Sequence, residues 1–365
     1  MRMKKIILII VLVVIGGSIW YYESQRPERK GNESGEIKIQ SMDKKQKASQ
    51  YDTAKELVGV QQFINSESFK LADFIGKKVI LIDFWTYSCI NCQRTTPYLN
   101  AWWDKYKDKG LLIVGVHTPE FEFEKKYENV KAAVEKFGIK YPVVQDNSYS
   151  TWTAYDNRYW PRKYLIDIDG FIVYDHIGEG GYKETEMKIQ ELLNERMAVL
   201  GEEGKIAEKI TEEKANGIRA ESPETYFGSA RNQNFGSGTP GQEGTFKFVQ
   251  PVSIKNNVLY LTGDWQLTPE YAQDLSVGAK IFFKYNAKEV YFVASSEAGI
   301  KIRVWQDGKP VMEFAGDDIS KDEKSEGFIK ESRLYKLIKN TVQGEHILEI
   351  IFESPGLKAF AFTFG

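Results

Sequence analysis

The two cysteines of this chain stand in one short motif, Cys89-Ile90-Asn91-Cys92, and no other cysteine occurs among its 365 residues. Two thiols at this spacing can exchange with a disulfide of another molecule, because one thiol attacks and the other resolves the mixed disulfide. Half of a zinc site or an idle disulfide are the alternatives. Structural zinc needs four ligands, and the chain adds only three histidines that lie far apart in sequence, His117, His176 and His346. We therefore predict thiol–disulfide exchange, with no metal and no cofactor.

The sequence around the motif predicts a strand that turns into a helix at Cys89. Residues 79–85 form an apolar run, and residues 92–109 have helical periodicity. A thiolate at a helix N-terminus is stabilised by unpaired backbone N–H groups and by the positive end of the helix dipole. Cys89 is therefore the predicted attacking thiol, and Cys92, one turn further along the helix, is the predicted resolving thiol.

Strands and helices alternate around this motif. Further strands are predicted at 111–116, 141–145, 163–168 and 171–176, and further helices at 123–137 and 183–199. Such alternation indicates an α/β domain with a mixed sheet. After residue 223 the pattern changes to short alternating runs separated by glycine, asparagine and aspartate turns, as at 280–284, 289–293, 347–352 and 360–364. This pattern is typical of an all-β sandwich.

The first 22 residues predict a membrane anchor. Arg2, Lys4 and Lys5 precede 17 residues without charge. Basic residues stay on the cytoplasmic side of a membrane, so the rest of the chain is expected on the extracytoplasmic side. A cleaved signal peptide is the alternative. The predicted organisation is an anchor at 1–22, a spacer at 23–55, the α/β domain at 56–200, a charged linker at 201–222 and the β-domain at 223–365.

Several segments resemble a known family. Asp83-Phe84-Trp85 before the motif, Pro97 after it and Pro161 ahead of a strand are similar to the thioredoxin fold. More narrowly, residues 85–92, 97–102 and 114–121 resemble the thioredoxin-like part of DipZ proteins, within the TlpA/ResA class of extracytoplasmic thiol–disulfide oxidoreductases. Residues 222–228 and 360–365 are similar to the C-terminal domain of DipZ proteins.

This resemblance implies roles for residues around the cysteines. Asp83 matches the buried acid of thioredoxin, which handles the proton of the second cysteine. Pro161 matches the cis-proline that faces the cysteine pair, and Glu120 lies about where some ResA-like proteins keep an active-site acid. The substrate groove is expected beside three aromatic residues, Trp85, Tyr87 and Trp160.

For the C-terminal domain the resemblance implies a jelly-roll of the carbohydrate-binding-module type. Trp265 and Trp305 are the candidates for contact with a cell-wall glycan, since exposed aromatic faces commonly hold sugars. Sandwich cores also need large aromatic residues, and alternation does not say which face a ring occupies. A structural role or a role in docking protein clients is the alternative for this domain.

Together these features predict an extracytoplasmic, membrane-anchored thiol–disulfide oxidoreductase that reduces disulfides of exported proteins, with apocytochrome c as one candidate. Its electrons are expected from a separate CcdA-like membrane protein, because one short anchor stands where DipZ proteins usually carry a multi-helix transporter. A thiol peroxidase of the peroxiredoxin type is one alternative, with Thr86 matching its Pro-x-x-x-Thr-x-x-Cys pattern and Ile82 departing from it. A cell-surface glycan-binding protein with an accessory redox domain is the other. The net charge of −2 argues against nucleic acid as a partner.

Overall fold

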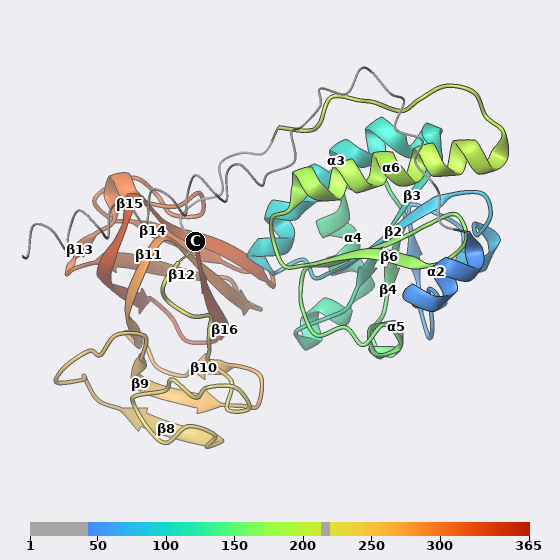
Figure 1. The fold of residues 1–365 in the computed structure, drawn as a ribbon. Helices are drawn as coiled ribbons and strands as arrows, with labels where there is room; N and C mark the ends of the chain where they lie inside the picture. Colours follow the sequence, from blue (N-terminus) through green and yellow to red (C-terminus); the bar gives the residue numbers. More distant parts are fainter. Residues whose placement is uncertain (1–42, 213–219) are drawn as a thin grey trace, which may run out of the picture. The chain divides into compact units, whose positions relative to one another are not determined.

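The computed structural model describes residues 43–212 and 220–365 (Figure 1). The predicted membrane anchor at 1–22 lies outside these residues. Within the described ranges, no helix is both long enough and apolar enough to span a membrane.

The first region is built on a six-stranded mixed sheet with the strand order β1-β4-β3-β2-β5-β6. Its central strands, β2 and β3, are buried along their whole length and pair in parallel. β4 continues the parallel pairing, whereas β5, β6 and β1 are antiparallel to their neighbours. The predicted α/β domain with a mixed sheet is therefore confirmed. The strands are β1 (Phe63–Ile64), β2 (Val79–Trp85), β3 (Leu111–His117), β4 (Val143–Gln145), β5 (Arg162–Ile166) and β6 (Ile172–Ile177).

Helices cover both faces of this sheet because β2 and β3 direct alternate apolar residues to opposite sides. Leu81 and Ile113 pack on one side with the buried faces of α3, α4 and α6. Ile82 and Val114 pack on the other side with α5 and a short 3-10 helix, η1. In Figure 1, α3 and α6 run side by side above the sheet. The helices are α3 (Ile90–Tyr106), α4 (Tyr127–Lys136), α5 (Ser150–Ala154) and α6 (Tyr182–Leu200), with 3-10 turns η1 (Leu71–Asp73), η2 (Lys107–Lys109) and η3 (Glu122–Lys125).

The predicted spacer at 23–55 is wrong for its described part. Residues Lys44–Gln50 form a helix, α2. Its Lys47 is almost fully buried, and its ammonium lies 2.5–2.8 Å from carboxylate oxygens of Asp167, Asp169 and Glu195. Burial lowers the pKa of Lys47, but these ion pairs outweigh burial and hold the pKa well above its usual value. The charged residues that suggested a solvated spacer include Lys47, whose buried ion pairs attach α2 to the α/β domain.

The predicted linker at 201–222 is described except for residues 213–219. Residues 201–212 contain no helix and run along α6. The backbone of Ile206 pairs with the Asn194 side chain, and the N–H of Thr211 donates to the Glu186 carboxylate. This part of the predicted linker therefore packs against the α/β domain.

The second region is all-β, as predicted. Hydrogen bonds connect its strands in the order β13-β12-β15-β11-β16-β10-β9-β8, with β14 and β7 attached to β12 and β16. The two runs expected at 280–284 and 289–293 are one strand, β11, with a register shift between Ala287 and Glu289. β11 pairs with β9 through its first residues and with β16 through its last. Hydrogen bonds therefore link all of these strands, and their arrangement as a sandwich of the jelly-roll type stays a prediction.

The strands of this region are β7 (Thr225–Tyr226), β8 (Gly244–Phe248), β9 (Leu259–Leu267), β10 (Ala272–Asp274), β11 (Lys280–Ser296), β12 (Ile300–Gln306), β13 (Lys309–Pro310), β14 (Glu326–Ile329), β15 (Arg333–Phe352) and β16 (Leu357–Phe364). A 3-10 turn, η4 (Met312–Phe314), interrupts them. Asp43–Gly365 form one unit by their internal contacts.

Candidate active site

The two cysteines lie at the start of α3, and both are free thiols. Cys89 is the N-cap residue with an extended backbone, and its Sγ accepts a hydrogen bond from the N–H of Cys92 at 3.4 Å. Cys89 is half-buried and lines a pocket, whereas Cys92 is only 2% exposed. This geometry makes Cys89 the thiol that a partner molecule can reach, as the attacking role requires.

Burial makes ionisation of Cys92 difficult. It raises the pKa of the Cys92 thiol well above the usual value, and the adjacent Cys89 raises it further. A buried thiol attacks a disulfide only as the thiolate. Cys92 therefore needs a proton acceptor close to it before it can resolve a mixed disulfide.

Asp83 and Lys163 form a buried acid–base pair in the same region. The sheet register places Asp83 of β2 directly opposite Lys163 of β5, and both side chains are buried. Burial raises the pKa of Asp83 to about 7, while the positive charge of Lys163 opposes that shift. Burial likewise lowers the pKa of Lys163, and Asp83 opposes it. Asp83 also contributes to the raised pKa of Cys92, so the carboxylate and the thiol sense each other.

Lys163 was missed by the sequence analysis. Its ammonium donates to the carbonyl of Gly178 at 3.2 Å, and Oδ1 of Asp83 has no hydrogen-bond partner within the described ranges. A signal existed, because Lys163 alternates with Leu165 and so shares one face of the strand predicted at 163–168 with an apolar residue. What no local pattern supplied was its place opposite Asp83.

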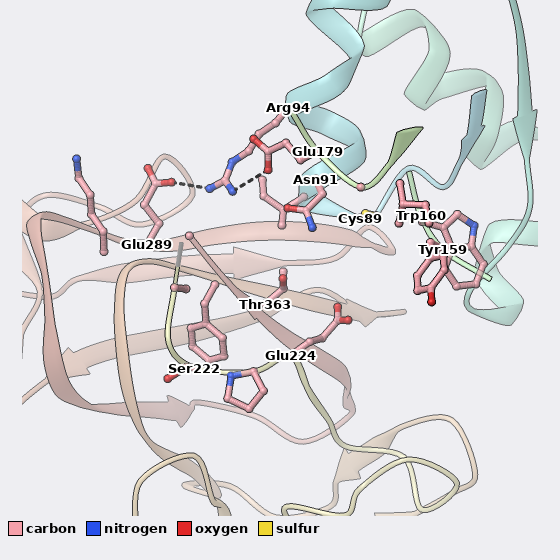
Figure 2. Close-up of a pocket in the computed structure, with 18 of the residues that line it drawn as sticks. Cys89, Asn91, Arg94, Tyr159, Trp160, Glu179, Ser222, Glu224, Glu289 and Thr363 are labelled. Atoms are coloured by element: carbon pink, nitrogen blue, oxygen red, sulfur yellow. Dashed lines mark hydrogen bonds and ion pairs between the residues drawn. The ribbon is translucent and has the colours of Figure 1, made fainter. Parts of the chain in front are cut away.

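The Trp160–Pro161 peptide bond is cis. Trp160 lines the pocket that contains Cys89, and its Nε1 donates to the carbonyl of Thr118 at 3.1 Å. Among the residues described, its backbone N–H and C=O make no backbone hydrogen bond. The segment therefore offers unpaired main-chain groups beside the attacking thiol (Figure 2).

Glu120 also lines this pocket, where residues of the second region hold it. Its Oε1 lies 2.8 Å from both Nη1 of Arg231 and the hydroxyl of Tyr226. That hydroxyl is also 2.7 Å from Oε2 of Glu224. One hydroxyl proton cannot serve two carboxylates at once, so Glu120 and the solvent-exposed Glu224 share the hydroxyl of Tyr226. The predicted acid is thus one member of a cluster whose other three members the sequence analysis missed.

Glu124 holds the backbone just before Cys89. Its Oε1 accepts from the hydroxyl and N–H of Ser88 at 2.6 and 3.2 Å, and its Oε2 accepts from the N–H groups of Glu120 and Phe121 at 2.6 and 3.1 Å. Burial raises the pKa of Glu124 to about 7, against the lowering effect of the Ser88 hydrogen bond. Glu124 joins the loop after β3 to the loop before α3. It was missed because no local sequence pattern connects it to Ser88, which lies 36 positions earlier.

This chain matches two protein families and several individual proteins of known sequence. Residues 52–175 match the AhpC/TSA family, and residues 222–365 match the thioredoxin-like C-terminal domain family. The thiol–disulfide oxidoreductase YkuV of Bacillus subtilis is 31% identical over 140 residues, which are 38% of this chain and 93% of YkuV. ResA of Bacillus thuringiensis is 32% identical over 123 residues, covering 34% of this chain and 68% of ResA. The chain belongs to the thioredoxin-like thiol–disulfide oxidoreductases.

The similarity extends beyond the redox domain of this oxidoreductase. DipZ proteins of Mycobacterium bovis and Mycobacterium tuberculosis are 38% identical over 316 residues, which are 86% of this chain. The chain spans 43% of the length of these DipZ proteins. The resemblance to DipZ proteins that was stated from the sequence is confirmed.

Two of the three aromatic residues expected at the substrate groove of the oxidoreductase lie elsewhere. Trp85 is 2% exposed, and its ring meets the buried ring of His117 edge-on at 5.1 Å. Tyr87 is buried, and its hydroxyl donates to the carbonyl of Ser332 in the second region. Neither residue lines the pocket, whereas Trp160 does. The prediction was wrong for Trp85 and Tyr87 because nearness to Cys89 in sequence does not determine which side of the chain faces the pocket.

The prediction of glycan contact is wrong for Trp265. This residue is fully buried in the core of the second region, and its Nε1 donates to the carbonyl of Thr262. Its side of β9 faces inward, which alternation alone could not determine. Trp305 of β12 is half-buried, and its contact with a glycan stays a prediction.

Proposed function

We propose that this oxidoreductase reduces disulfides of exported proteins on the extracytoplasmic side of a membrane. The observation that carries the proposal is the pairing of an accessible Cys89 thiol with a buried Cys92 above Asp83 and Lys163. An accessible attacking thiol and a shielded resolving thiol are what sequential exchange with a bulky disulfide requires.

The reaction transfers two electrons in two exchanges. The Cys89 thiolate attacks one sulfur of the client disulfide, so that a mixed disulfide forms and one client thiolate leaves. Cys92 then gives its proton to the Asp83 carboxylate and attacks Sγ of Cys89. A Cys89–Cys92 disulfide forms, the second client thiolate leaves, and both client thiolates take protons from solvent. The client is reduced and the oxidoreductase is oxidised.

The proposal includes a membrane anchor at residues 1–22 and a separate CcdA-like membrane protein that returns two electrons to the Cys89–Cys92 disulfide. The supports are the basic residues ahead of an uncharged run and the similarity to ResA and DipZ proteins. Alkylation of thiols in intact cells, followed by separation of the reduced and oxidised chains, tests the direction. A pair that is mostly reduced supports reduction of clients, whereas a pair that is mostly oxidised contradicts it.

Trapping of clients tests the assignment of the two thiols. Cys92→Ala should accumulate mixed disulfides through Cys89, because the resolving step is removed. Cys89→Ala should accumulate none, because Cys92 is buried. Equal trapping by the two variants would show that the roles are wrong.

Thiol peroxidase activity is the second candidate, since residues 52–175 match the AhpC/TSA family. Thr86 stands in the threonine position of the peroxiredoxin pattern, but it is fully buried and its hydroxyl lies 3.5 Å from Nε2 of His117. Consumption of hydrogen peroxide with thioredoxin as the reductant, measured beside reduction of a protein disulfide, separates the two functions. Faster turnover of peroxide would favour the peroxidase.

A further inference from the structure

The pocket that contains Cys89 has two walls contributed by the two regions. Cys89, Trp160 and Glu179 belong to the α/β domain, while Glu224 and Thr363 belong to the second region. Figure 2 shows Cys89 and Trp160 on one side of the pocket, with Thr363 and Glu224 across from them. A partner that reaches the attacking thiol through this pocket therefore lies against the second region as well.

Apolar packing fixes the second wall in place. Phe360 of β16 packs against Phe121 and Phe123 of the α/β domain, with ring centroids 5.2 and 4.8 Å apart. All three rings are buried in one core cluster that also contains Trp85 and Cys92. Domains joined through a buried apolar interface have little freedom to move relative to each other.

Polar contacts flank this apolar core. Arg94 of α3 joins Glu179 of its own region to Glu289 of β11, at 3.5 and 2.9 Å (Figure 2). Glu120 is held by Arg231 and Tyr226, as described above. These contacts hold the wall opposite Cys89 on two sides, so the folded chain itself determines the shape of this wall.

The size of the pocket selects the kind of partner. Its volume is about 1730 Å³, whereas pockets for small molecules have about 300–1,000 Å³. A sphere of that volume has a radius of about 7 Å, while a folded domain of about 100 residues has a radius of gyration of about 13 Å. Extended chain, at about 3.3 Å per residue and about 5 by 10 Å in cross-section, fills the pocket with on the order of ten residues.

We propose that the second region is the client-selecting wall of the active site, and that the pocket accepts a disulfide on an extended polypeptide segment and excludes one on the surface of a folded domain. The unpaired main-chain groups of Trp160 supply hydrogen bonds for such a segment on one side. The carboxyl group of Glu224 and the hydroxyl of Thr363 line the other side. This inference rests on the proposed reduction of protein disulfides.

Narrowing the pocket from the second wall tests the proposal. Thr363→Trp adds a large ring inside the pocket without changing any residue of the α/β domain. Lys339→Trp does the same from an exposed position of β15, where folding is least at risk. Val342→Trp is the matched control, since Val342 is an exposed residue of the same strand and does not line the pocket. Thermal unfolding of each variant checks that it is folded.

The full chain is first reduced, freed of the reductant and then mixed with dithiobis-nitrobenzoate as a small disulfide or with an unfolded polypeptide that has one disulfide. Both pocket variants should lower the second-order rate constant for the polypeptide at least about tenfold and change that for the small disulfide less than about twofold. The control should change neither. Equal losses of rate on both substrates, or no loss of rate on the polypeptide, would show that the second region does not select clients.

The natively folded form of the same one-disulfide protein completes the test. The wild-type chain should reduce the unfolded form at least about tenfold faster than the folded form, and comparable rates would overturn the selection for extended segments. A wild-type chain that reduces the small disulfide but neither protein form would overturn the polypeptide as occupant. Failure to reduce any disulfide would instead overturn the proposed function itself.

Discussion

At the scale of single residues, the resolving step depends on where the proton of Cys92 goes. Cys92 is buried and its pKa is raised, so solvent is a poor acceptor. Asp83 is the buried carboxyl group whose pKa, about 7, allows it to accept a proton near neutral pH. Lys163 keeps that carboxyl group partly ionised by its positive charge. Two predictions follow from this pair, one for each member.

Asp83→Asn should slow resolution of a mixed disulfide at neutral pH by about 10²-fold or more, the usual contribution of a general base. In the wild type the rate should rise through about pH 7 as Asp83 ionises. In the variant the rise should occur only in the alkaline range, where Cys92 ionises unaided, so the defect shrinks as pH increases. Stopped-flow kinetics from pH 5 to 10 measure both profiles. Asp175→Asn, at a carboxylate paired with Arg162 outside the pocket, is the control; identical profiles for Asp83→Asn and wild type would leave Asp83 a structural role.

Lys163→Met should shift the pH of the half-maximal resolution rate upward by about 1–3 units, the usual effect of losing one nearby opposite charge. The reason is that Asp83 without its counter-charge stays protonated to higher pH. Lys163→Arg keeps the positive charge, so a folded variant should return the pH of the half-maximal rate part of the way to the wild-type value. Lys105→Met removes an ammonium group that pairs with Glu186 instead and should leave the profile unchanged. A lower rate with no shift in Lys163→Met would mean that Lys163 acts through packing alone.

At the scale of elements, the start of α3 is held by Glu124 from the loop after β3. Four hydrogen bonds reach its carboxylate from Ser88, Glu120 and Phe121. Cys89 follows Ser88 directly, so the position of the attacking thiol depends on a residue 35 positions further along the chain. The strand-to-helix turn is therefore defined by the packing of two loops as well as by its own sequence.

Glu124→Gln should lower the free energy of unfolding by about 1–3 kcal/mol, because an amide keeps one acceptor oxygen and turns a donor toward the remaining N–H groups. Burial raises the pKa of Glu124 above its value in the unfolded chain. Ionisation of the unfolded chain therefore opposes folding as pH rises from about 4.5 to about 7, and this opposition is absent in the variant. Urea unfolding should therefore show a smaller difference in the free energy of unfolding between wild type and variant at pH 8 than at pH 5. Glu122→Gln, at an exposed side chain paired with Lys125, should change stability by less than about 0.5 kcal/mol.

At the scale of the whole molecule, the two described regions share a core. Phe360 of the β-region lies in the same cluster as Trp102 and Leu165 of the α/β domain. Shared burial of this kind couples the two regions energetically, because neither can unfold without exposing apolar surface of the other. The second region therefore folds together with the α/β domain, and its residues line the pocket that contains Cys89.

Phe360→Ala should lower the free energy of unfolding by about 3–5 kcal/mol, the usual cost of removing a buried phenylalanine ring. The wild type should unfold in one transition seen by both Trp fluorescence and circular dichroism, and the variant should lose that coincidence. Phe328→Ala, at an exposed ring of β14, is the control and should change stability little. Two separate transitions in the wild type would contradict a shared core.

Local sequence patterns were sufficient for the elements and the reactive thiols. The apolar run at 79–85 is β2 to the residue, and the strands at 111–116 and 171–176 are correct to within one residue. The periodicities of helices and strands depend only on which residues of one segment share a face, so each can be read from that segment alone. The thiol spacing and its place at a helix start are likewise local, and the structure leaves Cys89 accessible and Cys92 buried.

Tertiary structure alone decided the surroundings of those thiols. Lys163 meets Asp83 across 80 positions of sequence, and Arg231 meets Glu120 across 111. Trp265 faces the core of the second region, although a tryptophan at this position also suited an exposed surface for glycan contact. Strand register and the packing of distant elements determine these neighbours, and a local pattern carries no information about either. By itself the sequence indicated thiol–disulfide chemistry, and the three-dimensional fold determined which charged groups lie near the thiols and which residues of the second region line their pocket.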